Sequence, residues 1–180
     1  MVLFAFQIYF DFSGYSDIAR GLAKWMGYEF MLNFNKPYTA LGFSDFWARW
    51  HISLSTWFRD YVYIPLGGNR KGQVRSVGNL WATMLVSGMW HGASWMFLIW
   101  GGLHALYLTI EKFTRWNTWF GQGPLQRLIR GTIVFVAALL AWVFFRAESL
   151  GQAVMVFKQM FDPDRFNLQT LRQVGTLTVP

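Results

Sequence analysis

The uncharged stretch at residues 76–110 limits what this chain can fold into more than any other feature. None of its 35 residues is Asp, Glu, Lys or Arg. As one straight helix it would be about 52 Å long, whereas the hydrocarbon core of a bilayer is about 30 Å thick. The stretch must therefore fold back on itself. We expect the break at Gly92, directly after His91, between apolar segments at residues 77–90 and 94–110.

The composition also favours a membrane environment. Hydrophobic residues make up 54% of the 180 and aromatic residues 20%, and only 14% are charged, against about 25% in an average soluble domain. The net charge is +7, and the basic residues are scattered, which indicates anchors facing lipid headgroups rather than a nucleic-acid-binding surface. The chain has no Cys, which excludes disulfides and zinc sites of the Cys type. We therefore expect the protein to contact the lipid bilayer. We expect neither a nucleic-acid partner nor a metal site.

The first helix is predicted over residues 2–26. It contains Asp11 and Asp17, and carboxylates at membrane depth usually face a protein interior or a wet cavity. Asp17 is placed to pair with Arg20, three residues further on. Asp11 has no such neighbour, so we keep it as a candidate functional residue.

A second helix is predicted over residues 45–62. Ser44 is the expected N-cap, and Asp45 lies in the first turn, where a negative charge suits the helix dipole. Apolar residues recur at spacings of three and four and form one face that includes a single histidine. That face consists of Phe46, Trp47, Trp50, His51, Leu54 and Phe58.

A third apolar segment, residues 131–145, is flanked by Arg130 and Arg146, whose side chains can extend to the membrane surface. Ser149 then begins an S-x-x-Q capping box. The helix that follows is predicted to be amphipathic and to lie at the membrane interface. Its apolar face is expected to contain Leu150, Val154, Phe157 and Phe161. These segments predict an all-α integral membrane protein with short re-entrant and amphipathic helices, followed by a C-terminal tail at residues 162–180.

Three histidines are the side chains best suited to acid–base chemistry near neutral pH. His91 adjoins the predicted helix break. Placing a polar side chain at membrane depth costs free energy, and such residues usually serve a function, so a functional role is favoured. His51, beside Trp50 on the apolar face, fits a structural role as well as a functional one. His104 lies inside an apolar segment, and a structural hydrogen bond to a neighbouring carbonyl is the favoured interpretation.

Motifs of several other enzyme classes are missing from the sequence. It contains no G-x-S-x-G nucleophile elbow, no G-x-x-x-x-G-K-[ST] phosphate loop and no H-E-x-x-H metal motif. Serine hydrolase, NTPase and zinc protease functions therefore lose support.

Five motifs resemble, in the same order, those of the membrane-bound O-acyltransferases. They are FDFSGYSD at residues 10–17, FWARWHISLS at 46–55, RDYVYIPLGGNR at 59–70, WHGA at 90–93 and WVFFRA at 142–147. Family members are longer and have several membrane helices before the first of these motifs. The resemblance implies that residues 1–161 are the C-terminal part of such a domain, and we expect the isolated part to be inactive.

The resemblance also implies roles for individual residues. The histidine of the Trp-His-Gly motif, His91, corresponds to the one regarded as catalytic. The histidine of the Arg-Trp-His motif, His51, is expected to line the same buried channel and to be a catalytic residue together with His91. A water-poor channel suits a reactive thioester, and its expected lining or positioning residues are Asp11, Trp50, Trp90 and Trp95.

The implied function is transfer of an acyl group, chiefly acetyl, to hydroxyls of an exported polysaccharide such as alginate, directly or through a periplasmic acetyltransferase partner. The implied donor is acetyl-CoA or another acyl thioester, acting as substrate with no bound cofactor. The implied location is the bacterial inner membrane, which the chain would cross several times. His91 is the favoured general base, and a covalent acyl-histidine stays open. Alternatives from other classes are a proton or solute transport component and a non-catalytic membrane fragment.

Overall fold

The computed structural model of the protein describes residues 1–115 and 121–162. All regular elements within these residues are helical, which agrees with the predicted all-α class. In chain order they are α1 (Val2–Trp25), the 3₁₀ turn η1 (Pro37–Thr39), α2 (Phe43–Trp47), α3 (Ile52–Phe58), the π-helical turn η2 (Arg59–Tyr63), α4 (Gln73–His91), α5 (Trp95–Thr114), α7 (Pro124–Arg146) and α8 (Leu150–Met160).

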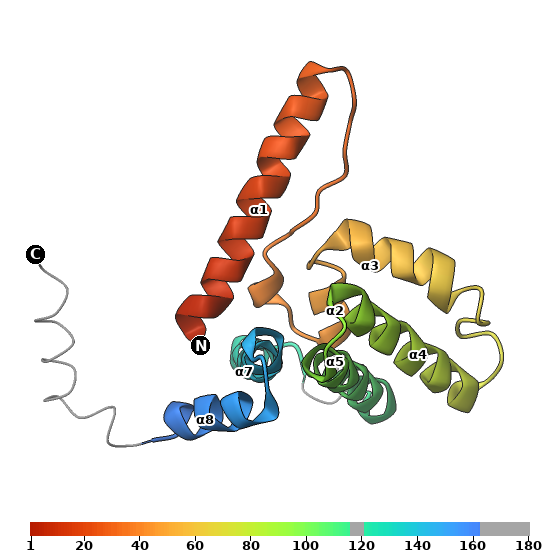
Figure 1. Cartoon of the computed structure of the whole chain (residues 1–180). Helices are drawn as coiled ribbons and strands as arrows, with labels where there is room; N and C mark the ends of the chain where they lie inside the picture. The colour runs from red at the N-terminus through yellow and green to blue at the C-terminus, as the bar shows by residue number, and fades with distance from the viewer. Residues whose placement is uncertain (116–120, 163–180) are drawn as a thin grey trace, which may run out of the picture.

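The helices gather around a pair formed by α4 and α5, and α7 packs against α5 (Figure 1). The N-terminal end of α1 lies beside α7, and its other end extends away from the remaining helices. The segment that follows α1 returns along it to η1 and α2. Short helices α2 and α3 are thereby held between α1 and the α4–α5 pair.

Two glycines allow α4 and α5 to approach closely. A Cβ atom on Gly88 of α4 would collide with the carbonyl oxygen of Phe97, and one on Gly101 of α5 would collide with that of Met84. Small residues at such positions are the usual means by which membrane helices bring their backbones together. The predicted fold-back is confirmed, since α4 ends at His91 and α5 begins at Trp95. The first arm is longer than expected, because α4 has 19 residues and begins at Gln73.

The single helix predicted over residues 45–62 is wrong. The chain breaks between α2 and α3, where His51 has a φ of 43° in the left-handed region. The reason is a contact with a distant residue, Asn33. Its carbonyl accepts a hydrogen bond from the Ile52 amide at 2.9 Å, and its side-chain oxygen accepts one from the Ser53 amide at 3.2 Å. These bonds satisfy the first amides of a new helix, which a continuous helix would have bonded internally.

The start of α2 also differs from the prediction, by two residues. Its N-cap is Gly42 rather than Ser44, and the Ser44 amide donates to the buried Glu111 carboxylate at 2.8 Å. Asp45 does lie in the first turn, as predicted. Its carboxylate accepts hydrogen bonds from the Leu41 amide and the Arg49 guanidinium.

Among the described residues, α7 is the one helix long and apolar enough to cross a membrane. It begins at Pro124, well before the predicted start at residue 131. The expectation that Arg130 reaches toward the membrane surface is wrong, because its side chain is buried and donates to the Leu41 carbonyl at 3.0 Å. Arg146, at the other end, places its guanidinium 4.8 Å from the centre of the Phe4 ring.

Helix α8 begins as predicted. Ser149 is its N-cap and accepts a hydrogen bond from the Gln152 amide, while the Gln152 side chain accepts from the Glu148 amide. Of the predicted apolar face, Leu150, Val154 and Phe161 are exposed, and the placement of this face at the membrane interface stays a prediction. The residues that pack inward are Ala153, Val156, Phe157 and Met160. Of the predicted tail, residues 163–180 lie outside the described residues.

Candidate active site

His51 and His91 line one cavity of about 260 Å³ where α1, the α2–α3 junction, the end of α4, α5 and α7 meet. The two histidines lie 40 positions apart in the sequence, and their convergence depends on the fold. Most of the cavity wall is aromatic or aliphatic. The other lining residues are Ile8, Phe12, Trp47, Trp50, Leu54, Trp90, Trp100, Trp142 and Phe145.

His91 is the last residue of α4, and its ring is held by the helix that carries it. Its Nδ1 atom lies 2.7 Å from the carbonyl oxygen of Ser87, one turn earlier. A carbonyl can only accept, so Nδ1 carries the proton, and in the neutral ring Nε2 has the lone pair. The ring meets Trp100 and Phe145 edge-on, with centroids 4.9 and 5.4 Å away. The imidazole is thus fixed in the tautomer that can accept a proton at Nε2.

Gly92 allows the chain to turn immediately after this histidine. A Cβ atom there would lie 2.6 Å from the ring of Phe97, closer than real Cβ contacts. The Phe97 ring in turn lies beside His91, with centroids 6.3 Å apart. The Trp-His-Gly sequence therefore places an imidazole at a helix end against which the next helix packs closely.

His51 is positioned by its backbone rather than by a regular helix. Its left-handed conformation is uncommon for a residue with a side chain and costs about 1–3 kcal/mol, which the Asn33 hydrogen bonds described above help to offset. The ring meets Phe12 edge-on at 4.6 Å and stacks on Phe34 at 6.3 Å between centroids. Both aromatic contacts hold the imidazole at the boundary of the cavity.

The structure brings together some of the predicted site residues and separates others. Trp50 is buried and Trp90 is 60% exposed, and both line the cavity with the two histidines. Trp95 is 77% exposed, and Asp11 is exposed on α1; neither is among the residues that line the cavity. The predicted ion pair between Asp17 and Arg20 is confirmed at 3.2 Å.

Sequence reasoning missed several walls of the cavity. Trp100 and Trp142, each 1% exposed, come from α5 and α7. The only signal of Trp100 in the sequence was a tryptophan in the middle of an apolar segment, which is equally typical of an ordinary core. Phe12, Trp142 and Phe145 belong to the motifs quoted above and gave no separate signal.

His104 is buried beside the cavity and does not line it. Its ring lies edge-on to Trp47 and Trp100, with both centroids 5.0 Å away. Within residues 1–115 and 121–162, its Nε2 atom has no hydrogen-bond partner. The same part of the chain contains no group of three or more His, Cys, Asp or Glu side chains that could hold a metal ion.

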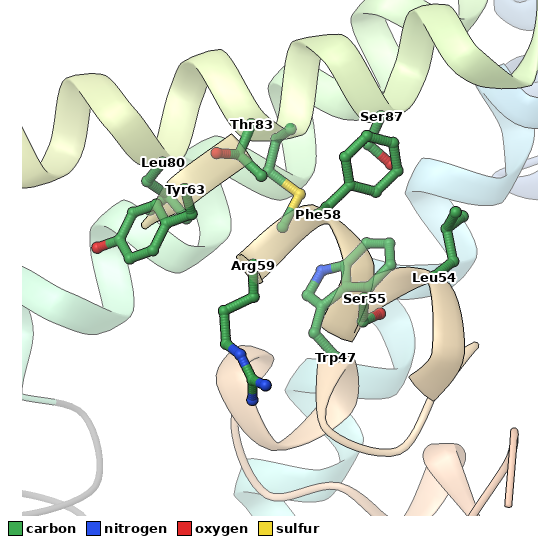
Figure 2. Close-up of a pocket in the computed structure, with 10 residues that line it drawn as sticks. Trp47, Leu54, Ser55, Phe58, Arg59, Tyr63, Leu80, Thr83 and Ser87 are labelled. Atoms are coloured by element: carbon green, nitrogen blue, oxygen red, sulfur yellow. The ribbon is translucent and has the colours of Figure 1, made fainter. Parts of the chain in front are cut away.

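A second cavity, of about 170 Å³, adjoins the first (Figure 2). Trp47 and Leu54 line both. Figure 2 shows Thr83 and Ser87 of α4 on one wall, with Trp47 opposite them. The remaining lining residues are Ser55, Phe58, Arg59, Tyr63, Leu80 and Met84.

Arg59 provides positive charge at the edge of this second cavity. Its exposed guanidinium donates to Asp60 at 2.7 and 3.2 Å. These hydrogen bonds hold the pKa of the Asp60 carboxyl below its ordinary value. Because both groups are in solvent, the pair contributes little to stability, and the guanidinium can exchange Asp60 for another anion.

The described residues form an all-helical protein with one helix, α7, long and apolar enough to cross a membrane and an apolar cavity lined by two histidines. The chain belongs to the membrane-bound O-acyltransferase family, whose model matches residues 1–150. Family membership identifies it as a membrane protein.

Individual relatives support the same assignment. A probable alginate O-acetylase of Pseudomonas fluorescens is 46% identical over 96% of this chain and 36% of its own length. A peptidoglycan O-acetyltransferase of Helicobacter pylori is 44% identical over 87% of this chain and 30% of its own. A teichoic acid D-alanyltransferase of Streptococcus thermophilus is 38% identical over 62% of this chain and 28% of its own. The chain thus spans about a third of the length of the curated relatives it matches.

Proposed function

We propose that this protein transfers an acetyl group from a thioester donor to hydroxyls of an exported polysaccharide. The observation that carries the proposal is the cavity shared by His51 and His91, with His91 held through Nδ1 so that Nε2 is the basic nitrogen. The names of the relatives, an alginate O-acetylase and a peptidoglycan O-acetyltransferase, support an acetyl group and a polysaccharide acceptor.

In the proposed reaction His91 is the general base. Its Nε2 takes the proton of the acceptor hydroxyl as the oxygen attacks the thioester carbonyl. The C–S bond then breaks, and the imidazolium returns the proton to the departing thiolate, so that the products are an ester and a free thiol. A positioned base of this kind contributes about 10²- to 10⁴-fold. Walls made of Trp50, Trp100 and Trp142 exclude water that would otherwise hydrolyse the thioester.

The second cavity is the proposed donor site. It is almost entirely apolar, shares Trp47 and Leu54 with the first cavity, and has Arg59 at its edge. Tyr63 and Leu80 also line a third cavity, of about 400 Å³, which Lys112 lines as well. A coenzyme A thioester has an acyl arm for the apolar part and phosphates for the two basic side chains. Acetyl-CoA is therefore the proposed donor.

We further propose that the protein acts in the bacterial inner membrane, crosses it several times, and receives its donor from the cytoplasm. The acceptor is either the polysaccharide itself or a periplasmic acetyltransferase partner that completes the delivery. A supporting role for the Asp11 carboxylate belongs to the same proposal, and this side chain is exposed and does not line the cavity.

The test is an assay on membranes that contain the protein as its gene encodes it. Membranes are incubated with acetyl-CoA labelled in the acetyl group and with alginate oligosaccharides. We expect label to appear as alkali-labile ester on the oligosaccharide, together with one free thiol per ester. Membranes from cells that lack the gene are the control. Equal labelling in both preparations contradicts the proposal.

A further inference from the structure

A groove lies on the other side of Phe12 and His51 from the cavity that holds His91, and its mostly apolar lining also includes charged side chains. Its volume is about 600 Å³. It lies between the second half of α1, the segment after α1 and the start of α3. Its lining includes Phe12, Tyr15, Arg20, Glu29, Phe30 and His51.

Phe12 and His51 line both the groove and the cavity. Their rings meet edge-on with centroids 4.6 Å apart, so together they form the wall between the two spaces. The left-handed backbone of His51 and the hydrogen bonds of Asn33 to the start of α3 fix where that wall stands. One imidazole thus borders the groove on one side and the His91 cavity on the other.

The groove differs in chemistry from the two apolar cavities. It combines a guanidinium and a carboxylate, Arg20 and Glu29, with the exposed rings of Tyr15 and Phe30. Arg20 is held in place, because it donates to the Phe30 carbonyl at 3.3 Å and to Asp17 at 3.2 Å. Charged groups that exchange hydrogen bonds with hydroxyls, beside aromatic faces that cover apolar ring atoms, suit a sugar and not an acyl chain.

We propose that this groove is the acceptor subsite and binds a saccharide. Glu29 and Tyr15 contact the sugar that lies in the groove, and the His51 ring moves aside so that one hydroxyl reaches His91. His51 is then a positioning residue at the entrance to the reaction cavity. This inference rests on the proposed acetyl transfer and adds the place from which the acceptor comes.

Glu29→Gln and Tyr15→Ala test the groove with little risk to folding. Both side chains are exposed, and the first substitution keeps the size of the side chain. With acetyl-CoA and an alginate hexasaccharide as substrates, we expect Glu29→Gln to raise the KM for the hexasaccharide about tenfold, the equivalent of one hydrogen bond to a charged group. Tyr15→Ala is expected to raise it about fivefold through the lost ring contact. The KM for acetyl-CoA is expected to stay the same in both.

Tyr28→Ala is the matched control, because Tyr28 is an exposed tyrosine beyond the end of α1 and does not line the groove. A higher KM for the hexasaccharide in both groove variants and not in the control supports the inference. An unchanged KM in the groove variants, or an equal rise in Tyr28→Ala, overturns it. Consumption of acetyl-CoA that requires His91 is measured first in the unaltered protein. If that is missing, the proposed function itself has failed.

Discussion

The Nδ1 atom of His91 lies 2.7 Å from the carbonyl oxygen of Ser87 in the last turn of α4. Ser87 lines the second cavity, and His91 lines the first. One helical turn therefore borders the proposed donor site and also fixes the ring of the proposed base. Displacement of α4 would change the proposed donor site and the position of the His91 ring together. The packing of this helix is therefore expected to affect the reaction.

That packing depends on Gly88, and we expect Gly88→Ala to destabilise the protein by about 1–3 kcal/mol, the usual cost of overpacking. The added Cβ would collide with the carbonyl oxygen of Phe97 on α5, and this backbone cannot move aside as a side chain would. Thermal unfolding in detergent is the measurement.

Gly78→Ala on the same helix is the control. Nothing lies within 4 Å of a Cβ atom at that position, so the substitution should leave stability unchanged or raise it by about 0.5–1 kcal/mol through the higher helix propensity of Ala. Equal destabilisation by both substitutions would show that the close approach of α4 and α5 is not the cause.

His104→Leu should leave most of the transfer activity and should not lower the unfolding temperature. His104 is 2% exposed and its Nε2 lacks a hydrogen-bond partner among the described residues. Replacing an unsatisfied buried polar group by an apolar one of similar size is close to neutral. Unfolding and acetyl transfer are measured on the same preparation. A loss of transfer as large as that of a His91 variant would assign His104 a chemical role.

The segment from Arg59 to Arg75 is predicted to face the cytoplasm. It contains Arg59, Arg70, Lys71 and Arg75, with Asp60 as its acidic residue, and basic excess marks cytoplasmic loops. Lys71→Cys, in a version of the protein otherwise free of Cys, should react with a membrane-impermeant maleimide only after the inner membrane is opened. Labelling in intact spheroplasts would show that this segment faces the periplasm. Arg59 would then lie on the opposite side of the membrane from cytoplasmic acetyl-CoA.

Features set by neighbouring residues were predictable from the sequence. The end of α4 before Gly92, the N-cap at Ser149 and the pair between Asp17 and Arg20 each depend on residues a few positions apart. The presence of both histidines in one channel followed from the resemblance to a family and not from spacing.

Features set by distant contacts were not predictable. The break before α3 depends on Asn33, which lies some 20 positions earlier in the chain. Arg130 is buried because its partner is the Leu41 carbonyl, 89 positions away. Such contacts leave no periodic pattern in the sequence. The same applies to Trp142, which becomes a cavity wall only when α7 packs against α5.

The central claim is that Nε2 of His91 is the base for acetyl transfer, and His91→Ala tests it most directly. The rate at which acetyl-CoA is consumed and the ester is formed is compared between the variant and the unaltered protein at equal amounts in the membrane. We predict a loss of about 10²- to 10⁴-fold with an unchanged unfolding temperature, and a smaller loss in His51→Ala. Near-normal ester formation by a correctly inserted His91→Ala protein would contradict the account.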